Sequence, residues 1–207
     1  TAMGVFVDTA IPLSAPLDEL LDAAKSRYDV HFEPVTVGGD TLEVLQIDDV
    51  AALIDRQLAK AGDGPVELPY WATIWPAAML LAHSLRHLGP ANGRSLLEVG
   101  CGIGLVGLFA ARQGYDCLLT DIHPDALLFT KINILRNGLA DRASVAKADF
   151  TADRLGRRFD VIIGAEVLYL QDTYRSLLGT SGFEVLDFVP EDPRCGFHTI
   201  WLARRQP

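Results

Sequence analysis

Cysteine is scarce in this chain of 207 residues, and the three cysteines present form no recognisable pattern. Cys101, Cys117 and Cys195 are an odd number, lie far apart, and belong to neither a CxxC motif nor a cluster with histidine. This spacing argues against a disulfide framework and against a structural zinc site. We therefore expect a protein of a reducing compartment that holds no metal ion.

Long apolar runs and a basic N-terminal start are also missing. No run approaches the roughly 20 apolar residues that a helix needs to span a bilayer. Residues 1–12 lack the basic start of a signal peptide. We therefore expect a cytoplasmic protein with no membrane partner.

Basic residues are few relative to acidic ones. The chain has 18 Lys and Arg against 27 Asp and Glu, which gives a formal net charge of −9. Proteins that bind nucleic acid phosphates usually carry the opposite sign, so we expect no stable binding of nucleic acid. The hydrophobic fraction of 49% is sufficient for a substantial folded core.

The first 64 residues contain short elements of mixed type. Apolar residues at positions 17, 20, 21 and 24 have helical spacing, and residues 30–37 and 41–47 read as two strands around a turn rich in glycine. Asp48 or Asp49 can cap a further helix that reaches residue 58. We expect an N-terminal α+β extension over residues 1–64, followed by a second domain over residues 65–207.

Strands and helices alternate from residue 94 onward. Strands are predicted at 95–99, 117–120, 143–148 and 159–163, with helices at 105–112 and 123–136. Such alternation predicts an α/β fold with a doubly wound, mostly parallel sheet, whose ligand loops lie at the carboxyl ends of the strands. Residues 183–189 and 197–203 predict an antiparallel C-terminal hairpin.

Three glycines at alternate positions follow the strand at 95–99. Gly100, Gly102 and Gly104 allow a sharp backbone turn that a ligand can approach closely. The helix behind them directs its first N–H groups at that ligand. Residues 102–107 also fit GxGxxG, so a dinucleotide site remains an alternative at this point.

Acidic residues at the strand ends favour another ligand. Glu98 would repel a pyrophosphate but suits an ammonium or sulfonium group, and S-adenosylmethionine carries both. Asp121 can accept hydrogen bonds from two ribose hydroxyls, which NAD and S-adenosylmethionine share. Asp149 offers a carboxylate to an adenine amino group and Phe150 a ring face beside it, although a cap or turn is the alternative role for Asp149.

Residues 97–104, followed by Thr120-Asp121-Ile122, resemble the seven-stranded class I S-adenosylmethionine-dependent methyltransferases. The segments Leu68–Ala78 and Gly164–Tyr169 are similar to the family 16 group, which contains many protein-lysine methyltransferases. The resemblance implies a Rossmann-like methyltransferase fold, S-adenosylmethionine as the cofactor, and a protein side-chain nitrogen, above all that of lysine, as the methyl acceptor.

The resemblance also implies roles for single residues. In that group the fourth strand is commonly followed by Asp-x-x-Tyr, which lines the substrate channel, and this chain has Glu166 and Tyr169 at the matching positions. A carboxylate can hold an incoming ammonium group, and a tyrosine can orient the amine beside a sulfonium, so we expect both to be catalytic. The expected cofactor-binding residues are Trp75, Glu98, Gly100, Cys101, Gly102, Gly104, Asp121, Ile122, Asp149, Phe150 and Ala165.

Further residues have less specific interpretations. Asn133 and Asn137 also match family positions, and we expect a cap or surface role for them. Cys101 lies between glycines, where a buried small residue is the simpler interpretation than a reactive thiol. The competing functions are a small-molecule or RNA methyltransferase on the same fold, and a cofactor-binding interaction module without catalysis.

The class I fold needs a fifth parallel strand and its helix before the C-terminal hairpin. Between Tyr169 and Phe183 there is room for one helix, at residues 172–178. We expect that a strand and a helix, on the order of 40 residues with their connections, belong near residues 178–182 of the protein but are not in this sequence. The alternative is a true six-stranded variant.

Overall fold

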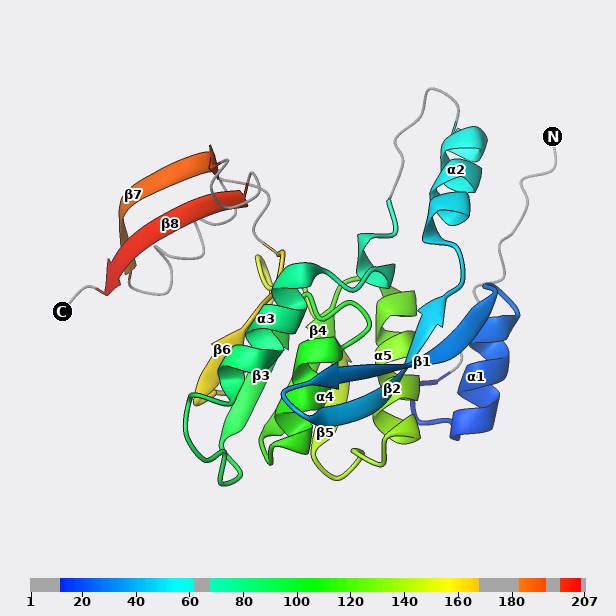
Figure 1. Ribbon diagram of the computed structural model, residues 1–207, viewed down its shortest axis with the longest axis horizontal. Coiled ribbons are helices and arrows are strands. Elements are labelled where there is room, and N and C mark those ends of the chain that lie inside the picture. The colour runs from blue at the N-terminus through cyan, green and yellow to red at the C-terminus, as the bar shows by residue number, and fades with distance from the viewer. Residues whose placement is uncertain (1–11, 62–67, 168–182, 193–197, 206–207) are drawn as a thin grey trace.

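The computed structural model describes residues 12–61, 68–167, 183–192 and 198–205 (Figure 1). Tyr169, the predicted helix at 172–178 and the predicted break near 178–182 lie outside these ranges.

Four parallel strands form the central sheet. They are β3 (Ser95–Val99), β4 (Asp116–Asp121), β5 (Ala143–Lys147) and β6 (Val161–Ile163), and their order is β5-β4-β3-β6. The chain therefore winds outward from β3 to β5 and returns to the other side of β3. The strand order reverses between β3 and β6, the position at which open α/β sheets bind their ligands. The doubly wound α/β fold predicted from the sequence is confirmed.

Three helices pack side by side on one face of this sheet (Figure 1). They are α3 (Pro76–Leu85), α4 (Leu105–Arg112) and α5 (Pro124–Arg136), and both α3 and α5 begin with a proline in the first turn. Proline suits this position because it has no N–H to leave unpaired and its φ angle is already helical. Helix α4 is followed by Gly114 at a φ of 97°, as expected for a glycine after a helix end.

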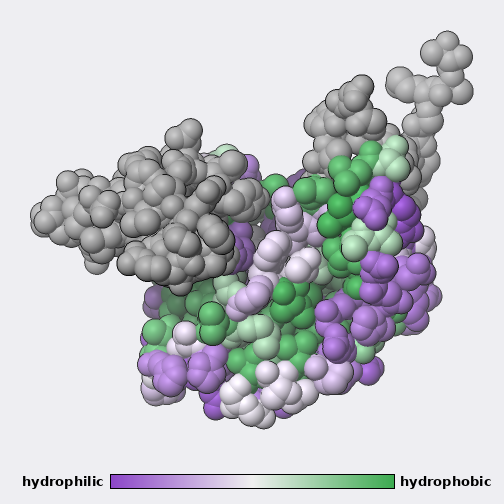
Figure 2. Space-filling view, turned by 45° about the horizontal axis from the view of Figure 1, so that its top comes forward, coloured by the Kyte–Doolittle hydropathy of each residue, from purple (hydrophilic) through white to green (hydrophobic). Residues whose placement is uncertain are grey.

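The N-terminal segment contains the elements that the sequence predicts. Helix α1 spans Leu17–Lys25, strands β1 (Val30–Val37) and β2 (Asp40–Ile47) form an antiparallel hairpin, and α2 spans Val50–Ala61. The Asp49 carboxylate accepts the Ala52 N–H at 2.8 Å and so caps α2. Hydrophilic residues gather at the right of the molecule in Figure 2, where α1 and the hairpin lie in Figure 1.

The N-terminal segment and the parallel sheet share one hydrophobic core. Leu20 of α1 and Val44 and Leu45 of β2 are almost fully buried in the same cluster as Phe109 of α4 and Phe129 of α5. Burial of apolar surface is the main favourable term in folding, so this common core fixes the segment onto α4 and α5.

Asn133 in α5 and Asn137, which directly follows α5, bind the outer edge of β2. Asn133 is 0% exposed; its Oδ1 accepts the Leu45 N–H at 2.7 Å and its Nδ2 donates to the Ile103 carbonyl at 3.0 Å. Asn137 accepts the Glu43 N–H at 3.0 Å and donates to the Glu43 carbonyl at 2.8 Å. Asn137 also follows the end of α5, which agrees with the expected cap role. The expected cap or surface role is wrong for Asn133. Its buried side-chain amide instead binds the backbone of β2 where no neighbouring strand does.

Strands β7 (Phe183–Asp192) and β8 (His198–Arg205) form the antiparallel hairpin predicted at the C-terminal end. Among the described strands they pair only with each other and not with the parallel sheet. Within the described residues, no helix is long and apolar enough to cross a bilayer.

We expect Asn133→Ala to lower the free energy of unfolding by about 3 kcal/mol, because the Leu45 N–H and the Ile103 carbonyl lose their partner inside the core. Urea unfolding followed by circular dichroism measures this change. The matched control is Asn137→Ala, where water can replace part of the lost bonding and the expected loss is about 1 kcal/mol. Equal losses in both variants would contradict the role of the buried amide.

Candidate functional site

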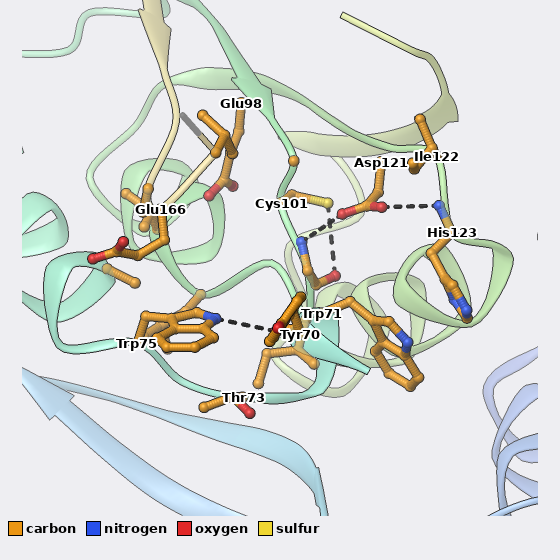
Figure 3. A pocket seen from close by; sticks show the side chains of 18 of the residues that line it. Tyr70, Trp71, Thr73, Trp75, Glu98, Cys101, Asp121, Ile122, His123 and Glu166 are labelled. Atoms are coloured by element: carbon orange, nitrogen blue, oxygen red, sulfur yellow. Dashed lines mark hydrogen bonds between the residues drawn. The ribbon is translucent and has the colours of Figure 1, made fainter. Parts of the chain in front are cut away.

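A pocket of about 490 Å³ opens at the carboxyl ends of the parallel strands (Figure 3). Its wall consists of residues that follow β3, β4, β5 and β6, together with the segment from Leu68 to Ala78. The pocket thus occupies the point of strand-order reversal between β3 and β6. Of the residues expected to contact a cofactor, all but Gly104 line it, as does Glu166.

The turn after β3 is packed on two sides so closely that only glycine fits. A Cβ on Gly102, whose φ is +54°, would lie 2.8 Å from the Trp71 carbonyl oxygen. A Cβ on Gly100, at φ +59°, would collide with Cγ1 of Val167. The segment before α3 and the loop after β6 therefore both pack against this turn, and each contacts it at a glycine.

Gly104 has a different role from the other two glycines of the turn. It is the N-cap of α4 at φ +85°, and a Cβ there would lie 2.7 Å from Cγ2 of Thr130. Its N–H donates to the Cys101 carbonyl at 2.8 Å, which closes the turn. Gly104 thus shapes the pocket from behind without lining it.

Asp121 connects the glycine turn to the start of α5. The residue is 8% exposed, and its two carboxylate oxygens accept the N–H groups of Gly102 and His123, each at 2.9 Å (Figure 3). A carboxylate offers about four lone-pair sites, so roughly two remain for a ligand. The turn is therefore held in place by the same group that can accept ligand hydroxyls.

Glu98 lies deeper in the pocket, at the end of β3. It is 2% exposed, and its Oε2 accepts the Gly107 N–H of α4 at 2.8 Å. Burial raises the pKa of Glu98 to about 8; the Gly107 N–H opposes this shift, and the negative charge of Asp121 adds to it. Glu98 consequently holds its proton to a higher pH than an exposed glutamate does.

An aromatic cluster supports the pocket wall near Asp121. The Trp71 ring stacks on His123, with ring centroids 5.0 Å apart and planes 22° from parallel, and Phe129 meets it edge-on. Tyr28, which follows α1, also contacts Trp71 edge-on and donates its hydroxyl to Asp125 at 2.7 Å. The roles of Tyr28 and His123 were not predicted from the sequence. His123 was interpreted only as the start of a helix next to Asp121. Tyr28 lies 43 positions before Trp71, and no local sequence pattern connects the two residues.

Trp75 and Glu166 lie at the opposite end of the pocket from Asp121 in Figure 3. The Trp75 Nε1–H donates to the Tyr70 carbonyl at 3.0 Å, which fixes the indole over the pocket. Glu166 has a φ of +55°, a conformation that costs a residue with a Cβ about 1 kcal/mol. Strained residues of this kind concentrate at functional sites, which singles out Glu166.

The remaining expected residues have simpler surroundings. Burial raises the pKa of the Cys101 thiol well above its usual range, and the Glu98 and Asp121 carboxylates add to this, so the buried small residue expected here is what the structure contains. Asp149 accepts hydrogen bonds from the Thr151 hydroxyl and N–H, which hold its pKa below the usual range, so it is a turn residue at the pocket rim.

We expect Gly102→Ala to destabilise the fold and to weaken binding of S-adenosylmethionine at least tenfold, because the methyl group would collide with the Trp71 carbonyl. Gly138→Ala is the matched control: its φ of +65° is similar, but the added Cβ meets nothing within 4 Å. The control carries only the cost of a left-handed residue, about 1 kcal/mol. Thermal melts and calorimetric titrations of both variants make the comparison, and equal effects would argue against the close contact.

Glu98 makes the stability of the ligand-free protein depend on pH. The folded state keeps a proton that the unfolded state loses, so stability falls as pH rises from about 4.5 to about 8 and is level above that. We expect Glu98→Gln, which can still accept the Gly107 N–H, to remove this fall of at most about 1.4 kcal/mol per pH unit. Urea unfolding at a series of pH values tests this, and an unchanged slope in the variant would assign the dependence to another group.

Comparison with known proteins agrees with this geometry. Residues 70–182 match the model of a family described as lysine methyltransferase. The chain is 34% identical to mouse EEF1A lysine methyltransferase 3 over 65% of this chain and 55% of that protein. It is 30% identical to the rat electron transfer flavoprotein beta subunit lysine methyltransferase over 87% of this chain and 73% of that protein.

Among solved structures, the T. thermophilus 16S rRNA N2 G1207 methyltransferase superposes with a TM-score of 0.54 at 19% identity. That match covers 76% of this chain and 42% of the solved one, and it supports the fold alone. The chain spans about half the length of several of the curated relatives it matches. Because the family model covers more than half of the chain and includes the glycine turn, the chain belongs to the lysine methyltransferase family.

Proposed function

We propose that this protein is an S-adenosylmethionine-dependent methyltransferase that methylates a lysine side chain of a protein substrate. The observation that carries the proposal is the meeting of carboxyl groups in one pocket: Glu98 and Asp121 at the glycine turn, and Glu166 at the far wall, with Asp149 at the rim. The first two suit the cofactor, and the third suits the acceptor.

The residues present fit S-adenosylmethionine. Asp121 retains acceptor positions for ribose hydroxyls, Ile122 and Phe150 offer apolar surface to an adenine ring, and Glu98 lies where a cationic group would be stabilised. The close fit of Gly102 against the Trp71 carbonyl fixes the turn that forms this side of the pocket. When bound, the cofactor supplies a methyl group on a cationic sulfur and leaves as the neutral thioether S-adenosylhomocysteine.

The acceptor end of the pocket fits a lysine side chain. The Glu166 carboxylate can hold the amine, and the faces of Trp75 and Tyr70 can contact the cationic ammonium form before it loses its proton. Methyl transfer to nitrogen depends mainly on in-line placement of a neutral amine, so holding and orienting the amine is the main task of these residues. Tyr169 is proposed as a second orienting group.

The class of substrate follows from the relatives and from charge. The relatives described above are named for lysine methylation of EEF1A and of the electron transfer flavoprotein beta subunit, so a protein substrate is proposed here. The net charge of −9 would attract a basic partner over long range. We propose the cytoplasm as the compartment and no stable binding of nucleic acid.

The direct test is incubation of the purified protein with methyl-labelled S-adenosylmethionine and a cell lysate. Label in a protein band that yields methyl-lysine on acid hydrolysis supports the proposal. Label in RNA or in small metabolites, or no label although the cofactor binds, would contradict the proposed substrate class.

Asp121→Ala and Glu166→Gln should separate binding from turnover. Asp121→Ala loses the ligand acceptor and the bonds to Gly102 and His123, so we expect the Kd for S-adenosylmethionine to rise at least tenfold. Glu166→Gln keeps the shape of the side chain but loses the charge, so we expect Kd within about twofold and kcat lowered at least tenfold. Calorimetry and the labelling assay measure the two effects; equal loss of cofactor binding in both variants would refute this division of roles.

A further inference from the structure

Thr130 is a buried threonine of α5 that lies behind the glycine turn. It is 0% exposed and is not among the residues that line the pocket. Its hydroxyl donates to the Gly102 carbonyl at 2.7 Å. Among the described residues, the other donor to this carbonyl is the Cys101 thiol, which is a weak donor and lies 3.7 Å away. The Thr130 hydroxyl is therefore the main hydrogen-bond partner of this carbonyl within the described part of the chain.

The Gly102 carbonyl belongs to a peptide group of the pocket wall. Gly102 and Ile103 both line the pocket, so the peptide that joins them is part of its surface. A peptide group is planar, so the direction of the carbonyl at one end also sets the direction of the Ile103 N–H at the other. A rotation of this peptide would therefore change both the shape and the polarity of the wall.

The backbone on either side of this peptide is held by other groups. The Gly102 N–H donates to Asp121 at 2.9 Å, but it belongs to the preceding peptide. The Ile103 carbonyl accepts the Asn133 Nδ2–H at 3.0 Å, but it belongs to the following one. Gly102 itself resists rotation of the peptide between them less than a residue with a Cβ would. The hydroxyl of Thr130 is consequently the group that selects one orientation of this peptide.

Helix α5 presents the Thr130 hydroxyl in a fixed position. Threonine is branched at Cβ, which leaves few rotamers in a helix. Its Cγ2 methyl also packs against Gly104, where an added Cβ would lie 2.7 Å from it. Thr130 and Asn133 are three positions apart and so share one face of the helix, from which they bind two successive carbonyls, those of Gly102 and Ile103. The helix after β4 thus holds the turn after β3.

We infer that Thr130 is a positioning residue for the adenosyl cofactor: its hydroxyl holds the peptide between Gly102 and Ile103 in the orientation to which the cofactor binds. This inference rests on the proposed function. A site that already has its binding orientation loses no affinity to a competing one, whereas a site that alternates between orientations binds in proportion to the competent fraction. Loss of the hydroxyl should therefore weaken cofactor binding without affecting the acceptor end of the pocket.

Thr130→Ser and Thr130→Ala form a matched pair, because both lose the methyl group and only the alanine variant loses the hydroxyl. By calorimetric titration with S-adenosylhomocysteine, we expect Kd within about twofold of wild type for Thr130→Ser and raised about tenfold for Thr130→Ala. In the labelling assay, Thr130→Ala should need about ten times more S-adenosylmethionine for half-maximal rate, with a maximal rate within about twofold of wild type. Equal Kd values for the two variants would overturn the inference.

Thr120→Val separates positioning from a general loss of stability. Thr120 is 1% exposed, and its hydroxyl donates to the Glu98 carbonyl at 2.8 Å, so it matches Thr130 in burial and bonding but does not line the pocket. We expect Thr120→Val and Thr130→Val to lower Tm by similar amounts, and only Thr130→Val to raise Kd about tenfold. A parallel rise of Kd in both variants would leave Thr130 a structural role alone and overturn the inference.

A measurement on the wild-type protein covers the case in which the variants without the hydroxyl fail to fold. Relaxation dispersion of the Ile103 amide detects rotation of its peptide on the microsecond to millisecond timescale. We expect no such exchange in the free protein; exchange that disappears when S-adenosylhomocysteine binds would show that the peptide is not held beforehand and would overturn the inference alone. Failure of the wild-type protein to bind either adenosyl ligand would overturn the proposed function, and the inference with it.

Discussion

The structure depends on the backbone turn after β3, which neighbouring segments contact at two glycines. Trp71 approaches Gly102 from one side, Val167 approaches Gly100 from the other, and Asp121 holds the turn through the Gly102 N–H. Because each contact needs a glycine or a backbone group, the turn has little freedom to relax. The pocket walls from three parts of the chain therefore meet at one preset position.

The N-terminal segment supports this turn from behind. The Asn133 side chain links the two parts by hydrogen bonds: it accepts the Leu45 N–H of β2 and donates to the Ile103 carbonyl within the turn. Tyr28 carries a second one, since its ring packs on Trp71, whose carbonyl meets Gly102. Residues 12–61 thus stabilise the site although none of them is among the residues that line the pocket. Their hydrogen bonds and ring contacts give these residues a physical purpose that their sequence does not suggest.

Most of the fold and much of the pocket could be predicted from the sequence, because the relevant signals are local. Short apolar runs that alternate with helical segments located the strands, and the spacing from Glu98 to Asp121 located two neighbouring strand ends. Asn133, Tyr28 and His123 could not be assigned in the same way. Their roles depend on partners 88 to 97 positions away for the first two, and on the ring stacking of Trp71 for the third.

The central claim is that the pocket holds a cationic adenosine cofactor and not a dinucleotide. Thermal melts of the purified protein with S-adenosylmethionine, S-adenosylhomocysteine and NADH, each at the same concentration, test it most directly. Binding to the folded state alone raises the melting temperature by mass action. We expect an increase in Tm with both adenosyl ligands and none with NADH; an increase with NADH alone would contradict the claim.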